Sequence, residues 1–327
     1  MSKSKSAPRA ATLIAILLLA LVVLFSGVQI VSSVLSAGNR SAGGTAGSKT
    51  ITVGGVDYFP RQDITVLLLM GIEETGPRAP SDSYNNTGEA DMIALAVFDE
   101  ADKSYTVLTL NRDTMLEMPV LGIGGKQAGT LYGQLALAHT YGTGMEDSCE
   151  NTKKAISDFL GGVQIDYYLS MNMDAVAILN DAVGGVRVTV TEDFSAVDGS
   201  LPAGEVLLTG EQALTFIRTR QGVGDQLNLS RMQRHEVYMN GFFEAFFAKL
   251  SQNDAFVLQT YDRIAPYTVS DCSSKTLSSF VSRYADYACK EIVSPKGENQ
   301  KGQTYMEFHV DEEALQQLIL RLFYKKK

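Results

Sequence analysis

The sequence predicts an α/β fold with helices on both faces of a mixed central β-sheet (α-β-α layers), preceded by one N-terminal transmembrane helix. Three observations lead to this prediction. Residues 64–72, ITVLLLMGI, are a continuous apolar run, which is typical of a strand buried on both faces. Strand-like and helix-like segments alternate after it, as they do in layered α/β domains. A long apolar run also lies near the N-terminus.

The elements of the main domain, residues 51–254, follow in order. Two more buried strands are expected at 91–99 and 104–113, and a helix at 149–160 before a Gly-Gly stop. Thr209 with Gln212 three residues later fits a capping box. The other expected elements are a strand at 166–171, a helix from about 173 to 184, a strand at 186–190, a helix at 209–217 and an amphipathic helix at about 230–250.

Residues 255–327 are expected to form a C-terminal extension of helices and strand, packed on this domain. Helical patterns cover 274–288 and 311–323, and a strand-like pattern covers 305–310. The last four residues, YKKK, are expected to be a solvated tail. No internal repeat is present in the sequence.

The N-terminus predicts a membrane anchor. Residues 1–10 carry Lys3, Lys5 and Arg9, and residues 11–35 are apolar enough to span a bilayer, which takes about 20 residues. The run is longer than the core of a cleaved signal peptide, so an uncleaved anchor is favoured. The preceding basic residues place residues 1–10 in the cytoplasm and residues from about 36 onward outside. Residues 36–50 are rich in Gly and Ser and are expected to be a flexible linker.

Composition excludes several classes of function. The net charge of the 327-residue chain is −9, which argues against a nucleic-acid partner, and no phosphate-loop or HExxH motif is present. With three histidines, a histidine-rich metal site is not expected, and His139 is interpreted as a satisfied core histidine, with a ligand contact as the alternative. Cys149, Cys272 and Cys289 allow at most one disulfide; a Cys272–Cys289 pair and three reduced thiols both remain open.

Four arginines cluster in residues 216–235, FIRTRQGVGDQLNLSRMQRH. Arginine binds phosphate through two parallel hydrogen bonds and keeps its charge. If the preceding helix ends near residue 217, Arg218 and Arg220 point the same way, because side chains of an extended segment repeat every two residues. Arg231 and His235 share one face of the following helix. The cluster predicts a local anion site; a solvated helix surface is the alternative.

Acidic residues stand close to another arginine in the sheet. Arg112 and Asp113 come where a strand ends, and Glu89 and Asp91 lie where the preceding strand begins. Carboxylates near a bound phosphate usually hold a divalent cation such as Mg²⁺. These residues predict an anionic, phosphate-bearing ligand with Mg²⁺. The alternatives are a turn residue at Asp91 and an ion pair between Arg112 and Asp113.

An ordered set of segments between about residues 63 and 247 resembles the LytR–CpsA–Psr family. The segments are ADMIALAVFDEADKSYTVLTLNRDTMLEMPV, LALAHTYG, SCENTKKAISDFL, IDYYLSMNMDAVAILNDAVGGVRVTV, GEQALTFIRTR and LSRMQR. The resemblance implies a membrane-anchored, Mg²⁺-dependent phosphotransferase outside the cell. Such an enzyme moves a glycopolymer, for example teichoic acid or capsule, from a polyprenyl-pyrophosphate carrier to a peptidoglycan acceptor.

The resemblance also implies roles for the site residues. Asp91 corresponds to the Mg²⁺-binding carboxylate, and Arg112, Arg218, Arg220 and Arg231 to the arginines that hold the pyrophosphate. The chain departs from the family pattern at Glu73, which replaces aspartate, at Glu89, which replaces arginine, and at His235, which replaces glutamine. Glu73 and Glu89 are therefore assigned to the metal site with Asp91, and His235 to substrate binding.

In the phosphotransferase, Arg112, Arg218 and Arg220 would offset the charge that develops on the phosphoryl group, and Asp113 is the candidate that accepts the proton of the acceptor hydroxyl.

Two further functions stay open beside the phosphotransferase. One alternative is a catalytically weak protein that binds polyprenyl-phosphate or wall polymer. The other is a lipid pyrophosphate phosphatase, which would use water as the acceptor.

Overall fold

The computed structural model describes residues 50–219, 222–224, 256–272 and 287–327. Between these ranges it also describes residues 234, 237–238, 240–242, 244–246, 248–249, 252, 280 and 283–284. The chain divides into two compact units, one built around residues 173–266 and 274–285, the other around residues 29–172, 267–273 and 286–327. Within the described ranges, no helix is long and apolar enough to cross a membrane. The predicted anchor at 11–35 lies outside them.

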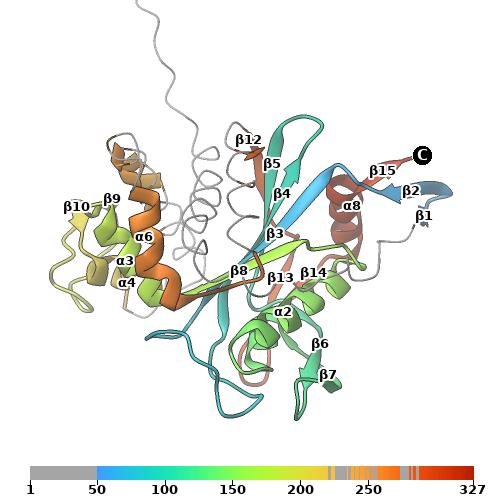
Figure 1. Cartoon of the computed structure of the whole chain (residues 1–327), viewed down its shortest axis with the longest axis horizontal. Helices are drawn as coiled ribbons and strands as arrows, with labels where there is room; N and C mark the ends of the chain where they lie inside the picture. The colour runs from blue at the N-terminus through green and yellow to red at the C-terminus, as the bar shows by residue number, and fades with distance from the viewer. Residues whose placement is uncertain are drawn as a thin grey trace, which may run out of the picture. The chain divides into compact units, whose positions relative to one another are not determined.

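The unit around residues 29–172 contains a six-stranded mixed sheet (Figure 1). Its strands, in spatial order, are β11 (Thr268–Ser270), β8 (Tyr167–Asn172), β3 (Ile64–Ile72), β4 (Ala90–Asp99), β5 (Ser104–Leu110) and β12 (Ala288–Val293). Strand β4 is antiparallel to both β3 and β5, whereas β8 is parallel to β3 and β12 is parallel to β5. The predicted mixed sheet is therefore confirmed, with the expected strands at its centre.

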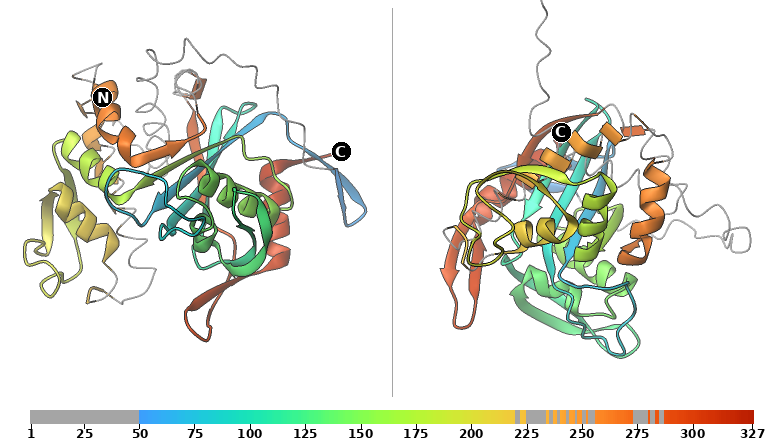
Figure 2. Two further views of the ribbon diagram at one scale, coloured as in Figure 1. Left: turned by 60° about the horizontal axis from the view of Figure 1, so that its bottom comes forward. Right: turned by 90° about the vertical axis from the view of Figure 1, so that its left-hand side faces the viewer.

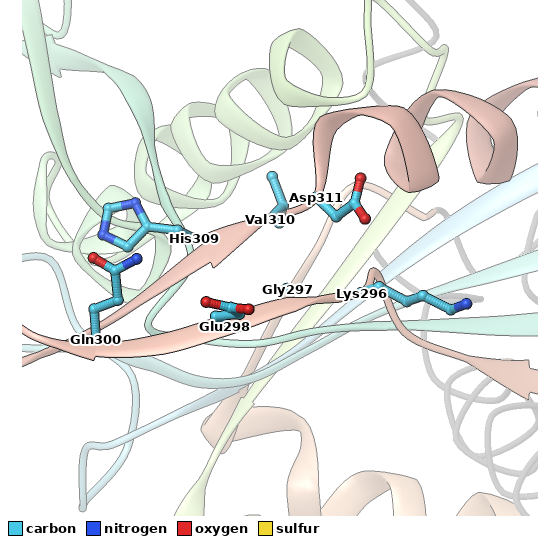
Figure 3. A pocket seen from close by; sticks show the side chains of 7 residues that line it. All are labelled: Lys296, Gly297, Glu298, Gln300, His309, Val310 and Asp311. Atoms are coloured by element: carbon cyan, nitrogen blue, oxygen red, sulfur yellow. The ribbon is translucent and has the colours of Figure 1, made fainter.

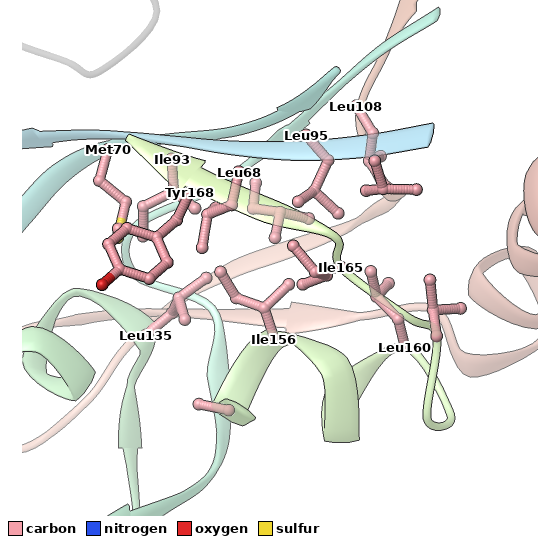
Figure 4. Packing of buried hydrophobic residues seen from close by; sticks show 14 of the residues in the cluster. Leu68, Met70, Ile93, Leu95, Leu108, Leu135, Ile156, Leu160, Ile165 and Tyr168 are labelled. Atoms are coloured by element: carbon pink, nitrogen blue, oxygen red, sulfur yellow. The ribbon is translucent and has the colours of Figure 1, made fainter. Parts of the chain in front are cut away.

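One face of this sheet packs on helices α2 (Glu146–Phe159) and α8 (Glu312–Phe323) and on the 3₁₀ helix η1 (Leu135–Thr140). Figure 4 shows Ile156 of α2 against the apolar side chains of the strands, among them Leu68 and Leu95. On the other face, Leu67 and Leu69 are also buried, with 1% and 2% of their surface exposed. Strand β3 is thus buried on both faces, as its continuous apolar run predicts. Coverage of both faces by helices stays a prediction.

Three smaller β-structures complete this unit. A hairpin joins β6 (Met115–Leu121) to β7 (Gln127–Gln134), and a second one, which projects in Figure 2, joins β13 (Gly297–Lys301) to β14 (Met306–Val310). The third is a sheet of β1 (Ile51–Val53), β2 (Val56–Pro60) and β15 (Tyr324–Lys326). The prediction of a solvated YKKK tail is therefore wrong, because Tyr324 is buried and β15 pairs with β2.

The other unit contains α3 (Met173–Ala182), β9 (Val186–Val190), β10 (Gly204–Leu208), α4 (Gly210–Arg218) and α6 (Phe256–Ile264); the short helix η2 (Ala265–Tyr267) follows α6. Helix α3 packs against both α4 and α6, and β9 pairs with β10 in an antiparallel ladder. Helix α4 begins with the predicted capping box, in which Thr209 and Gln212 each hydrogen-bond the other's backbone N–H. Of the expected helix at 230–250, the described positions are helical and the others lie outside the described residues.

Some C-terminal expectations need correction. The helical pattern at 274–288 does not extend to its predicted end, because Ala288 begins strand β12, which pairs with β5. Strands β11 and β12 thus bring residues from the predicted extension into the same sheet as the main domain. The division at residue 254 stays a prediction. All three cysteines are free thiols, so the possible Cys272–Cys289 disulfide is absent.

Candidate functional site

The topology of the sheet places the predicted acidic residues and Arg112 at one edge. Because β4 runs antiparallel to β3 and β5, the end of β3, the start of β4 and the end of β5 meet there. Glu73 directly follows β3, Glu89 directly precedes β4, and Arg112 follows β5. Side chains from three separate strands therefore converge on one site.

Glu73, Glu89 and Asp91 each offer one carboxylate oxygen, and these oxygens all lie within 4.8 Å of one another. A β-bulge brings Asp91 into this group. Gly71 pairs with Met92 but Ile72 pairs with Ala90, so Asp91 is the extra residue on β4. Bulges of this kind redirect a side chain and are frequent beside active sites.

Arg112 lies within this acidic group. Its guanidinium forms ion pairs with Glu89 and Asp91, and its Nε lies 3.6 Å from Oδ1 of Asp113. Only 11% of the Arg112 side chain is exposed. Like charges packed this closely need a compensating cation, which Arg112 supplies in part. The donor set fits a hard divalent cation such as Mg²⁺, because it consists of carboxylate oxygens, two of them partly buried and that of Glu73 exposed, where β3 ends and β4 begins.

Arg112 and Asp113 lie in a turn rather than on the strand, since β5 ends at Leu110 and not at the predicted residue 113. Asn111 forms this turn: its side-chain oxygen accepts the N–H of Asp113 at 3.0 Å, and its carbonyl accepts the N–H of Thr114. Asparagine favours such turns because its side chain can bond the backbone two residues on. The hydrogen bonds of this turn fix the backbone from which the side chains of Arg112 and Asp113 project.

Gln134, at the end of β7, orients Asp113. Its amide nitrogen donates to Oδ1 of Asp113 at 2.9 Å and to the carbonyl of Met306 at 2.8 Å. The N–H of Phe308 on β14 also donates to the Asp113 carbonyl. The sequence does not predict the role of Gln134, because its contact with Asp113 depends on the β6–β7 hairpin, whose second strand has little apolar alternation.

The loop between β3 and β4, which carries Glu73 and Glu89 at its ends, is held by buried polar groups. The Asn86 amide donates to the carbonyls of His139 and Gly142, at 2.9 and 3.0 Å, and its oxygen accepts the N–H of Gly88. His139 Nδ1 bonds the Gly88 carbonyl at 2.7 Å, and a Cβ at Gly88 would lie only 2.9 Å from Ile72 Cγ2. The position of Gly88, which precedes Glu89, is thus restricted by the hydrogen bond of its N–H, by that of its carbonyl and by the close approach of Ile72.

His139 is fully buried, which confirms its interpretation as a core histidine. Burial is the largest cause that lowers the pKa of His139 to about 4, and the charge of Arg78 lowers it further. The hydrogen bond to Gly88 and the charge of Asp147 act in the opposite direction. At neutral pH the ring is therefore uncharged and donates from Nδ1 to the Gly88 carbonyl.

In the other unit, helix α4 ends at Arg218, and Thr219 is extended with φ −61° and ψ 128°. The helix therefore ends one residue after the predicted position, and the Arg218 side chain is exposed. Arg220, Arg231 and His235 lie outside the described residues. That Arg218 and Arg220 share a site with Arg112 and Arg231 stays a prediction.

A separate pocket of about 460 Å³ lies on the β13–β14 hairpin (Figure 3). Lys296, Glu298, His309 and Asp311 are among its lining residues. His309 Nε2 lies 2.9 Å from a carboxylate oxygen of Glu307. None of the predicted site residues lines this pocket.

The chain belongs to the LytR_cpsA_psr family, whose model matches residues 31–323. The match covers nearly all of the residues that the structure describes. The resemblance seen in the sequence between about residues 63 and 247 is confirmed.

Among curated proteins, the chain is similar to two enzymes named polyisoprenyl-teichoic acid–peptidoglycan teichoic acid transferase TagU. It is 29% identical to the one from Bacillus cereus (strain AH820) over 155 residues, which are 47% of this chain and 44% of the relative. It is 31% identical to the one from Enterococcus faecalis over 154 residues, 47% of this chain and 45% of the relative. The matched region thus spans less than half the length of these relatives.

Among solved structures, the chain is similar to TagT bound to LI-WTA, with 21% identity, 85% of this chain and 96% of that chain covered, and a TM-score of 0.57. Bacillus subtilis TagV has 19% identity, coverage of 80% and 96%, and a TM-score of 0.57. A protein from Streptococcus agalactiae has 20% identity, coverage of 79% and 87%, and a TM-score of 0.61. At these identities the likeness concerns the fold.

Proposed function

We propose that this chain is a membrane-anchored phosphotransferase that moves a glycopolymer from a polyprenyl-pyrophosphate carrier to peptidoglycan outside the cell. The observation that carries the proposal is the sheet edge where Arg112 lies among Glu73, Glu89 and Asp91. Family membership and the names of the two TagU relatives, which contain both the polyisoprenyl-linked donor and the peptidoglycan acceptor, support the same reaction.

The proposed chemistry assigns a step to each group. The hydroxyl of the peptidoglycan acceptor attacks the phosphorus that bears the glycan, and the bond between this phosphorus and the bridging oxygen of the pyrophosphate breaks. Polyprenyl phosphate leaves, and Asp113, oriented by Gln134, accepts the hydroxyl proton. Arg112, with Arg218, Arg220 and Arg231, offsets the charge on the phosphoryl oxygens, and His235 donates a hydrogen bond to them.

Mg²⁺ is the proposed cofactor, with Glu73, Glu89 and Asp91 as the residues that hold it. When bound, it would neutralise negative charge on the pyrophosphate and on the departing phosphate. The support for this assignment is the convergence of three carboxylate oxygens within 4.8 Å of one another where β3 ends and β4 begins.

The location of the protein is part of the proposal. We expect residues 11–35 to anchor it, with residues 1–10 in the cytoplasm and the domain from about residue 51 outside, where the acceptor is. Protease added to intact protoplasts should digest the domain, whereas a cytoplasmic control protein should survive. Full protection of the domain would contradict this topology.

A transfer assay tests the function. The full-length chain in detergent is mixed with a polyprenyl-pyrophosphate-linked glycan, a soluble peptidoglycan fragment and Mg²⁺. We expect glycan on the peptidoglycan fragment, and we expect Arg112→Ala to reduce the rate at least about a hundredfold, as loss of one transition-state donor does. Release of free phosphorylated glycan, without transfer, would instead indicate a lipid pyrophosphate phosphatase. Binding without any turnover would indicate a binding protein.

Arg61 provides a matched control for Arg112. It also bridges two carboxylates, Asp63 at 3.2 Å and Asp99 at 2.6 Å, and 13% of its side chain is exposed. Asp99 ends β4, so this ion-pair group lies at the opposite edge of the same sheet. Arg61→Ala should lower stability but leave the transfer rate of folded protein close to that of the parent.

A further inference from the structure

Arg234 belongs to the arginine cluster at 216–235 but is buried, with 5% of its surface exposed. Its Nε donates to the carbonyl of Phe216 at 2.8 Å, and Nη2 donates to the carbonyl of Thr219. Its Nη1 forms an ion pair with Glu192. A charged side chain this deeply buried is costly unless its charge and its donors are matched, as they are here.

The two carbonyls that Arg234 binds lie at the C-terminal end of helix α4. The last four carbonyls of a helix have no partner within the helix, and a positive charge near that end interacts favourably with the helix dipole. Arg234 supplies both the donors and the charge, from a residue far along the chain. Its two backbone hydrogen bonds therefore lie on either side of Arg218, where α4 ends and the chain becomes extended at Thr219.

Aromatic packing reinforces the same contact. The guanidinium of Arg234 lies 5.7 Å from the ring centroid of Phe194, and this ring stacks on that of Phe216 at 5.7 Å with an interplanar angle of 27°. Phe216 belongs to α4, two residues before Arg218. Hydrogen bonds hold the backbone of the helix end, and the stacked rings hold its side.

We propose that Arg234 is a positioning residue, which sets the direction in which Arg218 leaves the end of α4 and does not itself bind ligand. The inference rests on the proposed function, in which Arg218 binds the pyrophosphate. Arg218 is exposed and can reach a ligand, whereas Arg234 is buried and contacts only the protein. Lysine cannot replace Arg234, because a single ammonium cannot present the planar fork that reaches three separate acceptors.

Two measurements on the full-length chain in detergent test this inference. The first is hydrogen–deuterium exchange of a peptide covering residues 210–219. The second is the affinity for farnesyl pyrophosphate, a short soluble stand-in for the carrier lipid. Arg234→Lys should speed exchange in the last turn of α4 and weaken binding by about tenfold, as Arg218→Ala should. The double variant should bind about as weakly as either single variant, because both changes remove the same interaction.

Arg187→Lys is the matched control. Arg187 lies exposed on β9 in the same unit, so this change should alter neither exchange nor affinity. If Arg234→Lys does not fold, Glu192→Gln, which removes the partner charge and keeps the arginine, should shift both measurements in the same direction by a smaller amount.

Each outcome decides the inference. Unchanged exchange at the end of α4 would overturn it. Faster exchange with unchanged affinity, where Arg218→Ala weakens binding, would also overturn it, because Arg234 would then have a structural role only. Additive losses in the double variant would show that Arg234 acts separately from Arg218 and would overturn it as well. If the parent does not bind farnesyl pyrophosphate, the proposed function fails, and the exchange data alone decide whether Arg234 fixes α4.

Discussion

At the scale of single residues, the acidic group at the start of β4 makes a direct prediction about cation binding. Asp91→Asn should weaken binding of Mn²⁺, used as a paramagnetic probe, by at least about tenfold. Loss of a group that only orients a metal ligand already weakens metal binding by about 10- to 100-fold, and loss of a ligand itself should cost at least as much. Electron paramagnetic resonance of free Mn²⁺ measures the affinity. Asp99→Asn, at the opposite end of β4, is the control and should change little. Equal affinities for the parent and Asp91→Asn would remove Asp91 from the metal site.

His139 predicts how stability depends on pH. The folded protein holds its pKa at about 4, whereas the pKa in the unfolded chain is near 6.5. As pH falls below 6.5, the unfolded chain gains the proton first, so the contribution of His139 to stability is complete above pH 6.5 and is lost between 6.5 and 4. The full loss is about 3.5 kcal/mol, because the two pKa values differ by about 2.5 units and each unit corresponds to about 1.4 kcal/mol.

Urea unfolding of the parent and of His139→Gln at pH 7 and pH 4.5 measures this contribution. The parent should lose more stability than the variant between the two pH values, because only the parent has the ring to titrate. His309→Gln is the control, since His309 is partly exposed on β14. Identical pH dependence in the parent and His139→Gln would contradict the prediction.

The site residues that the sequence predicts are those whose position follows from their own strand. Glu89, Asp91 and Arg112 adjoin apolar runs, so their convergence follows once the strands are assigned and paired. Asn86, Gln134 and Arg234 act through contacts with distant segments. A single sequence contains no signal for such contacts, because polar residues in loops and on helices are usually solvated.

At the scale of elements, strong local signals were reliable. The apolar runs of β3 and β4 and the capping box of α4 lie where they were expected, and β5 begins as expected but ends three residues early, at Leu110. The β6–β7 hairpin was missed because β7, QAGTLYGQ, is exposed along most of its length and contains two glycines. Strand β7 is defined by its pairing with β6. It lacks the apolar alternation from which a strand is normally recognised in a sequence.

The capping box of α4 makes a prediction at this scale. Thr209→Ala should lower the free energy of unfolding by about 1 kcal/mol, because the N–H of Gln212 loses its acceptor. Chemical unfolding monitored by circular dichroism measures the change. Thr209→Ser keeps the hydroxyl and should retain most of the stability. If serine is as destabilising as alanine, the methyl group of Thr209 matters more than its hydrogen bond.

At the scale of the whole molecule, the sheet edge with the site depends on the C-terminal segment. Strand β12 extends the central sheet beside β5, β14 bonds the turn that carries Asp113, and α8 adds Leu315 and Phe323 to the core. Local patterns along the chain do not predict this, because residues 288–327 have the pattern of an ordinary mixture of helix and strand. Sheet order depends on pairing between distant segments, which local patterns do not encode.

The end of the chain makes the last prediction. Tyr324 is buried, and β15 pairs with β2, so the last residues close a sheet formed by segments from both ends of the described chain. Deleting residues 324–327 should lower the free energy of unfolding by about 2–4 kcal/mol, through the lost aromatic burial and strand pairing. Lys325→Ala/Lys326→Ala is the control and should cost less than about 1 kcal/mol, because exposed ion pairs such as Lys325–Asp63 contribute little. Urea unfolding measures both. A deletion no more harmful than the control would mean that the chain end is a tail that pairs without stabilising the fold.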